Sequence, residues 1–247
     1  FAFRDATKKL FDARIGKEWN LGQETPRRDE SKLGFEVLVE EMDPYRIVGL
    51  CDIDHTIPPV PDTPGGSVSG YHRWQSFLDT RIKRYAAKRN DPCEDVSSRM
   101  SAYLHYGMVS PMRLAREAFR LGADKYLDEL LIWRELAYGY CFYKDNYRSL
   151  ETLPTWAIQT LKRHEKDARK SLYSHESLSR GMTDDPLWNA CQHSLLKHGE
   201  LHNNVRMTWG KAILEWTETP ERALEVLIDL NHRYALDGRD PASYGGI

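Results

Sequence analysis

The chain lacks the cysteine spacing of a disulfide framework or a zinc site. Its four cysteines lie far apart, so we expect reduced, packed thiols in a cytosol-like compartment. No apolar run reaches the roughly 18 residues that a membrane-spanning helix needs. The first residues, FAFRDATKK, contain neither a starting Met nor a hydrophobic signal region, so the chain is expected to begin inside a longer gene product or to have a trimmed start.

The chain also lacks an excess of charge of one sign. It has 35 Lys and Arg against 37 Asp and Glu, a formal net charge of −2. Binding to a polyanion would therefore depend on a local patch. Two basic clusters are present, at residues 81–89 and 162–170, and the second is diluted by two acidic residues. Each is interpreted first as a solvated helix face.

Apolar residues make up 40% of the chain and aromatic residues 11%, enough to fill a substantial core. Residues 1–57 show little pattern: the start suits a short helix, 22–32 suit a polar loop, and FEVLVEEM and RIVGLCDI suit strand or helix alike. PPVPDTPGG holds four Pro and two Gly, which excludes a regular helix. We therefore expect an N-terminal segment at 1–57, a linker at 58–70 and a helical domain at 71–247.

Helical periodicity continues through the rest of the chain, with helices expected over 71–89, 124–143 and 153–170. Within 97–122 we expect a serine-rich turn, then a helix that starts at Ser110-Pro111 and stops at Gly122. Asp185-Pro186 predicts the start of another helix that ends at Gly199, and Thr219-Pro220 predicts the start of one that reaches Tyr234. Between them a helix is expected from about 200 to 216. The last three should form an antiparallel set joined by short turns.

Two features of this region allow more than one interpretation. The three serines at 97, 98 and 101 would suit a phosphate at a helix N-terminus, or would simply cap that helix. The stretch 124–143 is apolar on most faces, which predicts a buried helix. Its charged residues should then be paired or functional, and Glu129 with Arg134 is one possible pair.

The helix expected at 200–216 combines aromatic and polar residues. Trp209 and Trp216 fall on one face, about 10 Å apart along the axis, a short step for an electron. Asn203 and Arg206 occupy the preceding turns. A plain core stripe would account for the tryptophans but not for the two polar residues.

Several motifs of the chain resemble those of a known protein family. DPLWNACQ, LHNNVRMTWGKAILEWT, LIDLN and YALDGRDP resemble the flavin-binding domain of the photolyase and cryptochrome family. SSRMSAYLHYGMVSP is similar to the family's phosphate-binding turn, ELLIWREL to its WRE helix, and GGSVSGYHRW to a segment with a FAD-contacting Tyr. The tryptophan spacings of 21 and 7 residues resemble class II cyclobutane pyrimidine dimer photolyases. The resemblance covers residues 58–247 and implies an all-α, multi-helix FAD-binding domain with a short irregular N-terminal segment.

The resemblance also assigns roles to residues. Asn231 would face the flavin N5, and Arg206 with Asp237 would form an ion pair beside the ring, where a cation favours an anionic reduced flavin. The residues expected to bind FAD are Tyr71, Ser97, Ser98, Arg99, Met100, Ser101, Arg134, Arg206, Asn231 and Asp237. Those expected to pass electrons between surface and FAD are Trp188, Trp209 and Trp216. Those expected to line a lesion pocket are Glu129 or Glu135, Asn203 and Met207.

The implied reaction is light-driven repair, in which an electron from reduced FAD splits a cyclobutane pyrimidine dimer in damaged DNA. A light sensor of cryptochrome type and a cofactor-free helical interaction domain are the alternatives, and a (6-4) lesion stays open. We expect a monomer without metal or membrane partner. It would be cytoplasmic, nucleoid-associated in a bacterium, and nuclear or plastid in a eukaryote. Three departures stand out: no clear antenna domain, an end just after YGGI, and an HNN motif at 202–204 that is similar to class I.

Overall fold

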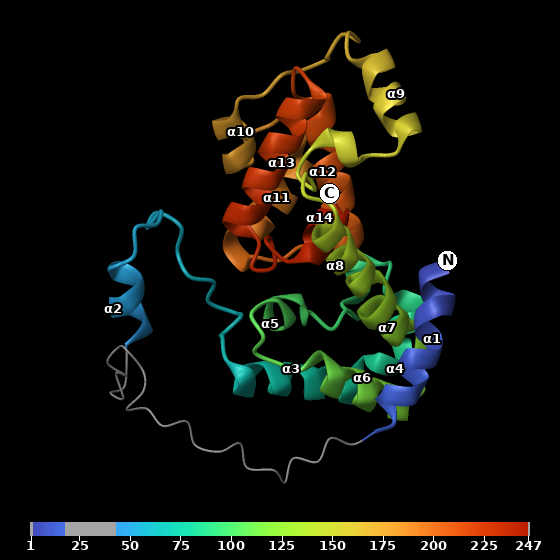
Figure 1. The fold of residues 1–247 in the computed structure, drawn as a ribbon. Helices are drawn as coiled ribbons and strands as arrows, with labels where there is room; N and C mark the ends of the chain where they lie inside the picture. Colours follow the sequence, from blue (N-terminus) through green and yellow to red (C-terminus); the bar gives the residue numbers. More distant parts are fainter. Residues whose placement is uncertain (1, 18–42, 247) are drawn as a thin grey trace, which may run out of the picture. The chain divides into compact units, whose positions relative to one another are not determined.

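A computed structural model describes residues 2–17 and 43–246, and its regular structure there is helical, with no strand (Figure 1). This confirms the predicted all-α class. The longer helices are α1 (Ala2–Ile15), α3 (Ser67–Thr80), α6 (Pro111–Arg120), α8 (Arg134–Tyr143), α9 (Thr155–His164), α11 (Pro186–His198), α12 (Asn203–Glu215) and α13 (Pro220–Tyr234). The shorter ones are α2 (Pro44–Gly49), α4 (Ile82–Lys88), η2 (Pro92–Glu94), α5 (Ser101–His105), α7 (Asp124–Asp128), η3 (Glu129–Trp133), η4 (Leu150–Thr152), α10 (His175–Arg180) and α14 (Pro241–Gly246).

Side-chain caps fix where α11 and α13, two helices in the C-terminal part of the chain, begin. The Asp185 carboxylate accepts hydrogen bonds from the backbone N–H groups of Leu187 and Trp188, and Pro186 fills the first helical position. The Thr219 hydroxyl caps α13 in the same way. Gly199 ends α11 with a φ of 63°, a left-handed conformation that glycine adopts without a Cβ clash. The predicted boundaries of α11 and α13 are therefore confirmed.

The described residues divide into two compact units, one of residues 2–15 and 60–246 and another that contains 43–59. In the second unit, the Asp43 side chain caps α2. The first unit begins earlier in the chain than the expected helical domain, because α1 packs on α6 and Arg4 pairs with Asp128 at 2.5 Å. The expected linker also ends sooner, since α3 starts at Ser67. FEVLVEEM and most of the expected polar loop lie outside the described residues.

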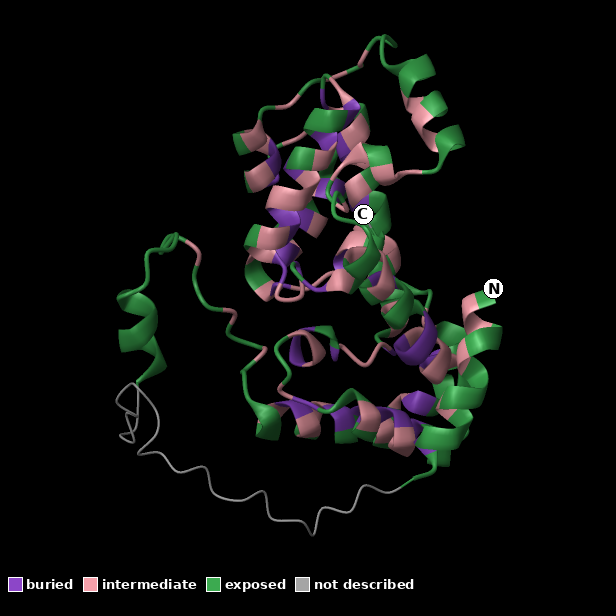
Figure 2. Ribbon diagram, viewed as in Figure 1, coloured by how far each residue is buried: buried purple, intermediate pink, exposed green. Residues whose placement is uncertain are grey.

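Buried apolar residues of the first unit form two clusters. Figure 2 colours buried residues purple along the ribbon. The first core draws on α1, α3 to α7 and η3. It includes Trp74, Phe77 and Tyr126, whose ring centroids lie 5.2–5.4 Å apart. The second core draws on α10 to α13 and includes Trp188 and Trp209. The unit therefore has two apolar cores, and α8 packs against α14 and η3.

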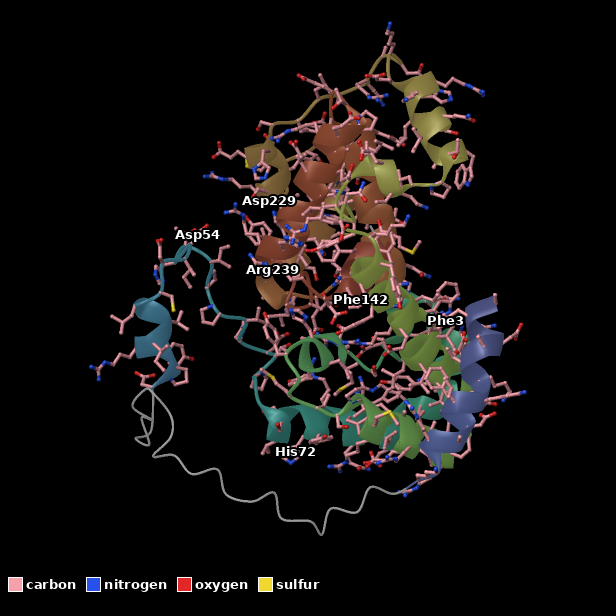
Figure 3. All side chains as sticks on the ribbon, viewed as in Figure 1. Phe3, Asp54, His72, Phe142, Asp229 and Arg239 are labelled. Atoms are coloured by element: carbon pink, nitrogen blue, oxygen red, sulfur yellow. The ribbon has the colours of Figure 1, made fainter. Side chains whose placement is uncertain are left out.

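The run 124–143 is helical throughout but is less buried than expected. Its middle, η3, is a π-helical turn. The extra residue in such a turn rotates the side chains that follow it around the helix axis. Leu130, Leu131 and Ile132 are buried, whereas Phe142 (labelled in Figure 3) and Tyr143 are 79% and 81% exposed. The prediction of a helix buried on most faces was therefore wrong for its second half.

The expected helix 71–89 is also interrupted. It forms α3 and α4 with a break at Arg81, where φ is −124°. The break lets Trp74 and Phe77 of α3 and Tyr85 of α4 enter one aromatic cluster.

We predict that Leu114→Ala lowers the free energy of unfolding by about 2–5 kcal/mol, because it empties a fully buried position of the first core. Chemical denaturation measures the change. Leu187→Ala is the matched control, since this leucine is 73% exposed and its loss should change stability by less than about 0.5 kcal/mol. Equal losses in the two variants would contradict the placement of the first core.

Candidate functional site

A cavity of about 1130 Å³ lies in the first unit, with walls from both cores. It is large beside the roughly 300–1,000 Å³ of ordinary small-molecule pockets. Residues 97–101 form part of the wall on the side of the first core, and α12 and α13 contribute from the second. The helix α9 lines another side through Trp156, Ala157, Thr160 and Leu161. The cavity can therefore take a ligand of dinucleotide size.

One face of α12 supplies four of the expected site residues. Asn203, Arg206, Met207 and Trp209 all line the cavity. They recur at three- and four-residue spacings, which places side chains on one side of a helix. The chain can turn into α12 at this point because Gly199 ends α11 just before it.

An ion pair stands at the cavity wall. Arg206 NH1 lies 2.9 Å from Asp237 Oδ1, without the angles of a hydrogen bond. Their side chains are 20% and 15% exposed, so each charge depends on the other for compensation. Asp237 follows α13, two residues before Arg239, which Figure 3 labels. The pair can thus present a cation to the cavity while its charge stays balanced.

Asn231 lies beside this pair in the last turn of α13, two residues after the labelled Asp229 (Figure 3). It is 1% exposed and lines the cavity. Its Nδ2 donates to the carbonyl oxygen of Gly238 at 3.0 Å, which fixes the amide orientation. Its Oδ1 accepts no hydrogen bond from the described residues. A buried, unpaired acceptor at a cavity wall is unfavourable unless a ligand donates to it.

The serine-rich turn lies in the opposite wall. Ser97, Ser98, Arg99, Met100 and Ser101 all line the cavity, as the resemblance leads one to expect of residues that hold one ligand. Arg99 adopts a φ of 53°, which is uncommon for a residue with a Cβ.

A carboxylate holds this turn in place. Glu200 Oε2 accepts from Arg99 Nε at 2.5 Å, and Glu200 Oε1 accepts from Arg73 NH1 at 3.0 Å. Burial disfavours the charged form of Arg99, but the attraction of Glu200 outweighs it and raises the pKa of Arg99. Arg73 belongs to α3, so Glu200 ties the turn after α11 to the first core.

Glu129 lines the cavity, whereas Glu135 is exposed and lies outside it. Glu129 Oε1 pairs with Lys125 at 2.7 Å and with Arg89 at 3.1 Å. Arg89 also sits over the ring of Tyr85, another cavity residue. Burial raises the pKa of Tyr85, and the Arg89 contact offsets part of that effect. The hypothesis of a Glu129–Arg134 pair is therefore wrong.

Three tryptophans form a continuous row from the cavity. Trp209 lines the cavity and stacks on Trp188, with centroids 6.1 Å apart and planes at 7°. Trp188 meets Trp216 edge-on at 5.3 Å. Trp188 therefore lies between Trp209 and Trp216, although the spacing of these two residues on one helix suggests that they are direct neighbours. The three indoles lie in one row that leads from the cavity to a partly exposed residue.

Two expected cofactor residues lie outside the cavity. The Tyr71 hydroxyl accepts from the backbone N–H of Ser110, and the Arg113 guanidinium covers the ring at 4.1 Å. Arg134 pairs instead with Asp240 at 3.0 Å, and Asp240 is only 3% exposed. In this structure both residues therefore contact other parts of the protein: Tyr71 contacts Ser110 and Arg113, and Arg134 forms an ion pair with Asp240.

Sequence reasoning missed Glu200, Gln192 and Tyr173. Gln192 is fully buried and accepts from Trp209 Nε1 at 3.1 Å, so it fixes the indole. Tyr173 meets Trp216 edge-on at 5.3 Å. The i to i+4 spacing of Trp188 and Gln192 on one helix is the only sequence signal for these contacts. Glu200 gave none, because its partners are more than 100 residues away.

Two kinds of site are absent from the described part of the chain. In residues 2–17 and 43–246 no three His, Cys, Asp or Glu side chains are grouped to hold a metal ion. Within the same ranges, each helix is too short or too polar to cross a membrane.

The unit is all-helical and has a large cavity lined by residues of both cores. An ion pair, an amide with an unpaired oxygen and the first indole of a tryptophan row line this cavity. No family model matches the chain. Curated relatives named deoxyribodipyrimidine photo-lyase do match. The protein of Methanothermobacter thermautotrophicus is 41% identical over 184 residues, 74% of this chain and 41% of the relative. Those of Potorous tridactylus and Arabidopsis thaliana are 42% and 44% identical, over 78% and 69% of this chain and 38% and 36% of the relatives.

A solved structure agrees with the fold. A bacterial class III photolyase from Agrobacterium tumefaciens superposes with a TM-score of 0.56 over 77% of this chain and 40% of that one, at 24% identity. The chain belongs to the photolyase family. It spans about two fifths of the length of the curated relatives it matches.

We predict that Gly238→Ala destabilises the protein by at least about 2 kcal/mol, because its Cβ would lie 2.0 Å from the Asn231 carbonyl oxygen. The turn must then shift, and the Asn231 amide loses its fixed orientation. Denaturant melts of this variant measure the loss. Gly139→Ala is the control, since a Cβ there meets nothing within 4 Å and should be neutral or stabilising. Similar melts for both variants would contradict the close approach.

Proposed function

We propose that the cavity binds FAD and that the chain is the flavin-binding part of a light-driven DNA repair enzyme, a deoxyribodipyrimidine photolyase. The observation that carries the proposal is the buried, unpaired Oδ1 of Asn231 next to the Arg206–Asp237 pair. A flavin ring offers an N–H donor and takes up negative charge on reduction. The cavity volume and the names of the relatives support the same cofactor.

The residues present fit this cofactor. Asn231 would accept from the flavin ring through its Oδ1, because its Nδ2 is already committed to Gly238. Arg206 would stabilise negative charge on the ring, while Asp237 limits the cost of a lone cation. The serine-rich turn would hold the phosphates through hydroxyl and backbone donors. When bound, FAD supplies one-electron chemistry driven by light.

The protein's own share of the reaction is positioning and exclusion of water. Glu129, Asn203 and Met207 line the cavity and would contact an extruded pyrimidine dimer, whose unstacking is easiest at a distorted lesion. Lys125 and Arg89 hold Glu129 in place. The order of the three tryptophans along the row, with its spacings of 21 and 7 residues, supports a class II enzyme.

Repair itself is the direct test. The purified chain, reconstituted with FAD, reduced chemically and illuminated without oxygen, should restore pyrimidines in dimer-containing DNA. Bound FAD without restored pyrimidines would favour a light sensor of cryptochrome type. A colourless protein that takes up no FAD would favour a helical interaction domain and end the proposal.

We predict that Trp209→Phe blocks photoreduction of bound oxidised FAD but leaves repair by the chemically reduced protein largely intact. Trp209 is the only member of the row that lines the cavity, within the described residues. Flavin absorbance during illumination with a reductant measures the effect. Trp74→Phe is the control, because Trp74 is equally buried but belongs to the first core. Normal photoreduction in the Trp209 variant would remove this residue from the electron path.

We predict that Arg206→Ala weakens FAD retention by roughly tenfold or more, because it leaves Asp237 as a part-buried carboxylate without its cation. The dissociation constant of FAD for the reconstituted protein measures the change. Arg239→Ala removes an exposed cation two residues from Asp237 and should leave the constant unchanged. An unaltered constant for the Arg206 variant would argue against the assigned ion pair.

A further inference from the structure

The structure distinguishes the two basic clusters of the sequence. The cluster at 81–89 is largely occupied within the protein. Arg84 and Lys88 both pair with Glu94, and Arg89 pairs with Glu129. Arg81 lies over the ring of Phe77. Little of this charge is left for an external partner.

The cluster at 162–170 differs, because most of its cations have no partner among the described residues. Lys162, Arg163, Lys166 and Lys170 are exposed and make no ion pair or side-chain hydrogen bond with residues 2–17 or 43–246. Of the two acidic residues, Asp167 is paired with His164 at 2.8 Å. The surface therefore carries several free positive charges in a chain whose formal net charge is −2.

This charged surface borders the cavity. The helix α9 (yellow in Figure 1) lines the cavity together with α11, α12 and α13 of the second core. It turns Ala157, Thr160 and Leu161 toward the cavity, and Lys162 and Arg163 follow directly in its last turn. Trp156, also a cavity residue, is 70% exposed. A large exposed aromatic side chain and free cations thus lie on one short helix at the cavity's edge.

We propose that α9 and the turn after it bind the sugar–phosphate backbone of a DNA strand that passes the cavity, through Lys162, Arg163 and Lys166, while Trp156 stacks on a neighbouring base. The choice of DNA rests on the proposed function. The chemistry itself, free cations next to an exposed aromatic ring, is that of surfaces that bind single-stranded nucleic acid.

The test measures binding of the full chain to a fluorescent oligothymidylate across a range of salt concentrations. This probe carries no lesion and the assay needs neither FAD nor light, so its outcome is separate from that of the repair assay. The triple variant Lys162→Gln, Arg163→Gln, Lys166→Gln should lower the slope of log K against log salt by about 2, since each lost phosphate contact removes about 0.7. Trp156→Ala should weaken binding by roughly five- to tenfold with the slope unchanged.

The matched control removes the same charge elsewhere. Lys9, Arg14 and Lys17 are exposed, lie in or just after α1 and have no partner among the described residues. Their replacement by Gln should leave the slope unchanged. The proposal is overturned if the wild-type chain does not bind the probe at low salt, if the α9 variant keeps the wild-type slope, or if the control loses as much. It is also overturned if anionic lipid vesicles bind more tightly than the oligonucleotide and lose that binding in the α9 variant.

Discussion

The site depends on the carboxylate of Glu200, held between Arg73 and Arg99 at 3.0 and 2.5 Å. The two apolar cores are separate clusters, and at the cavity the walls are joined by polar contacts. Next to Glu200, His202 reaches the backbone of Arg89 at 2.9 Å. A directional polar joint can fix the spacing of two walls without filling the space between them with side chains. That is why a cavity of this size persists beside two well-packed cores.

The position of Glu200 also explains how α12 can serve the whole cavity. The turn of Gly199 and Glu200 is fixed to the first core, so α12 starts from a set point and direction. Its successive turns then present Asn203, Arg206 and Trp209 along one wall. The aromatic end is fixed in a different way, because the indole of Trp209 donates to the buried Gln192. One helix is thus anchored by charge at its start and by a neutral hydrogen bond farther along.

The sequence was informative wherever a local rule decides the outcome. Caps and prolines fixed the limits of α11 and α13, and motif similarity named Arg206, Asn231 and Asp237, which the structure brings together. Local rules could not predict the surroundings of Arg134. Its orientation depends on the π-helical turn before it and on Asp240, a partner 106 residues away.

The same limit applies to burial and to unpaired groups. The apolar sequence at 124–143 predicts an all-round buried helix, but burial depends on which elements pack against it, and the described neighbours cover only part of its surface. Asn231 could be named from its motif, yet its unpaired oxygen follows from Gly238 taking the other end of the amide. Such a group becomes visible only when every neighbouring donor has been placed.

The burial of the tryptophan row would give the proposed electron transfer a direction. Trp209 and Trp188 are 2% and 3% exposed, whereas Trp216 is partly exposed and touches Tyr173. A positive charge is costly in a buried apolar environment and is stabilised where water reaches it. An electron taken from this row therefore leaves a charge that is most stable at its outer end, away from the cavity.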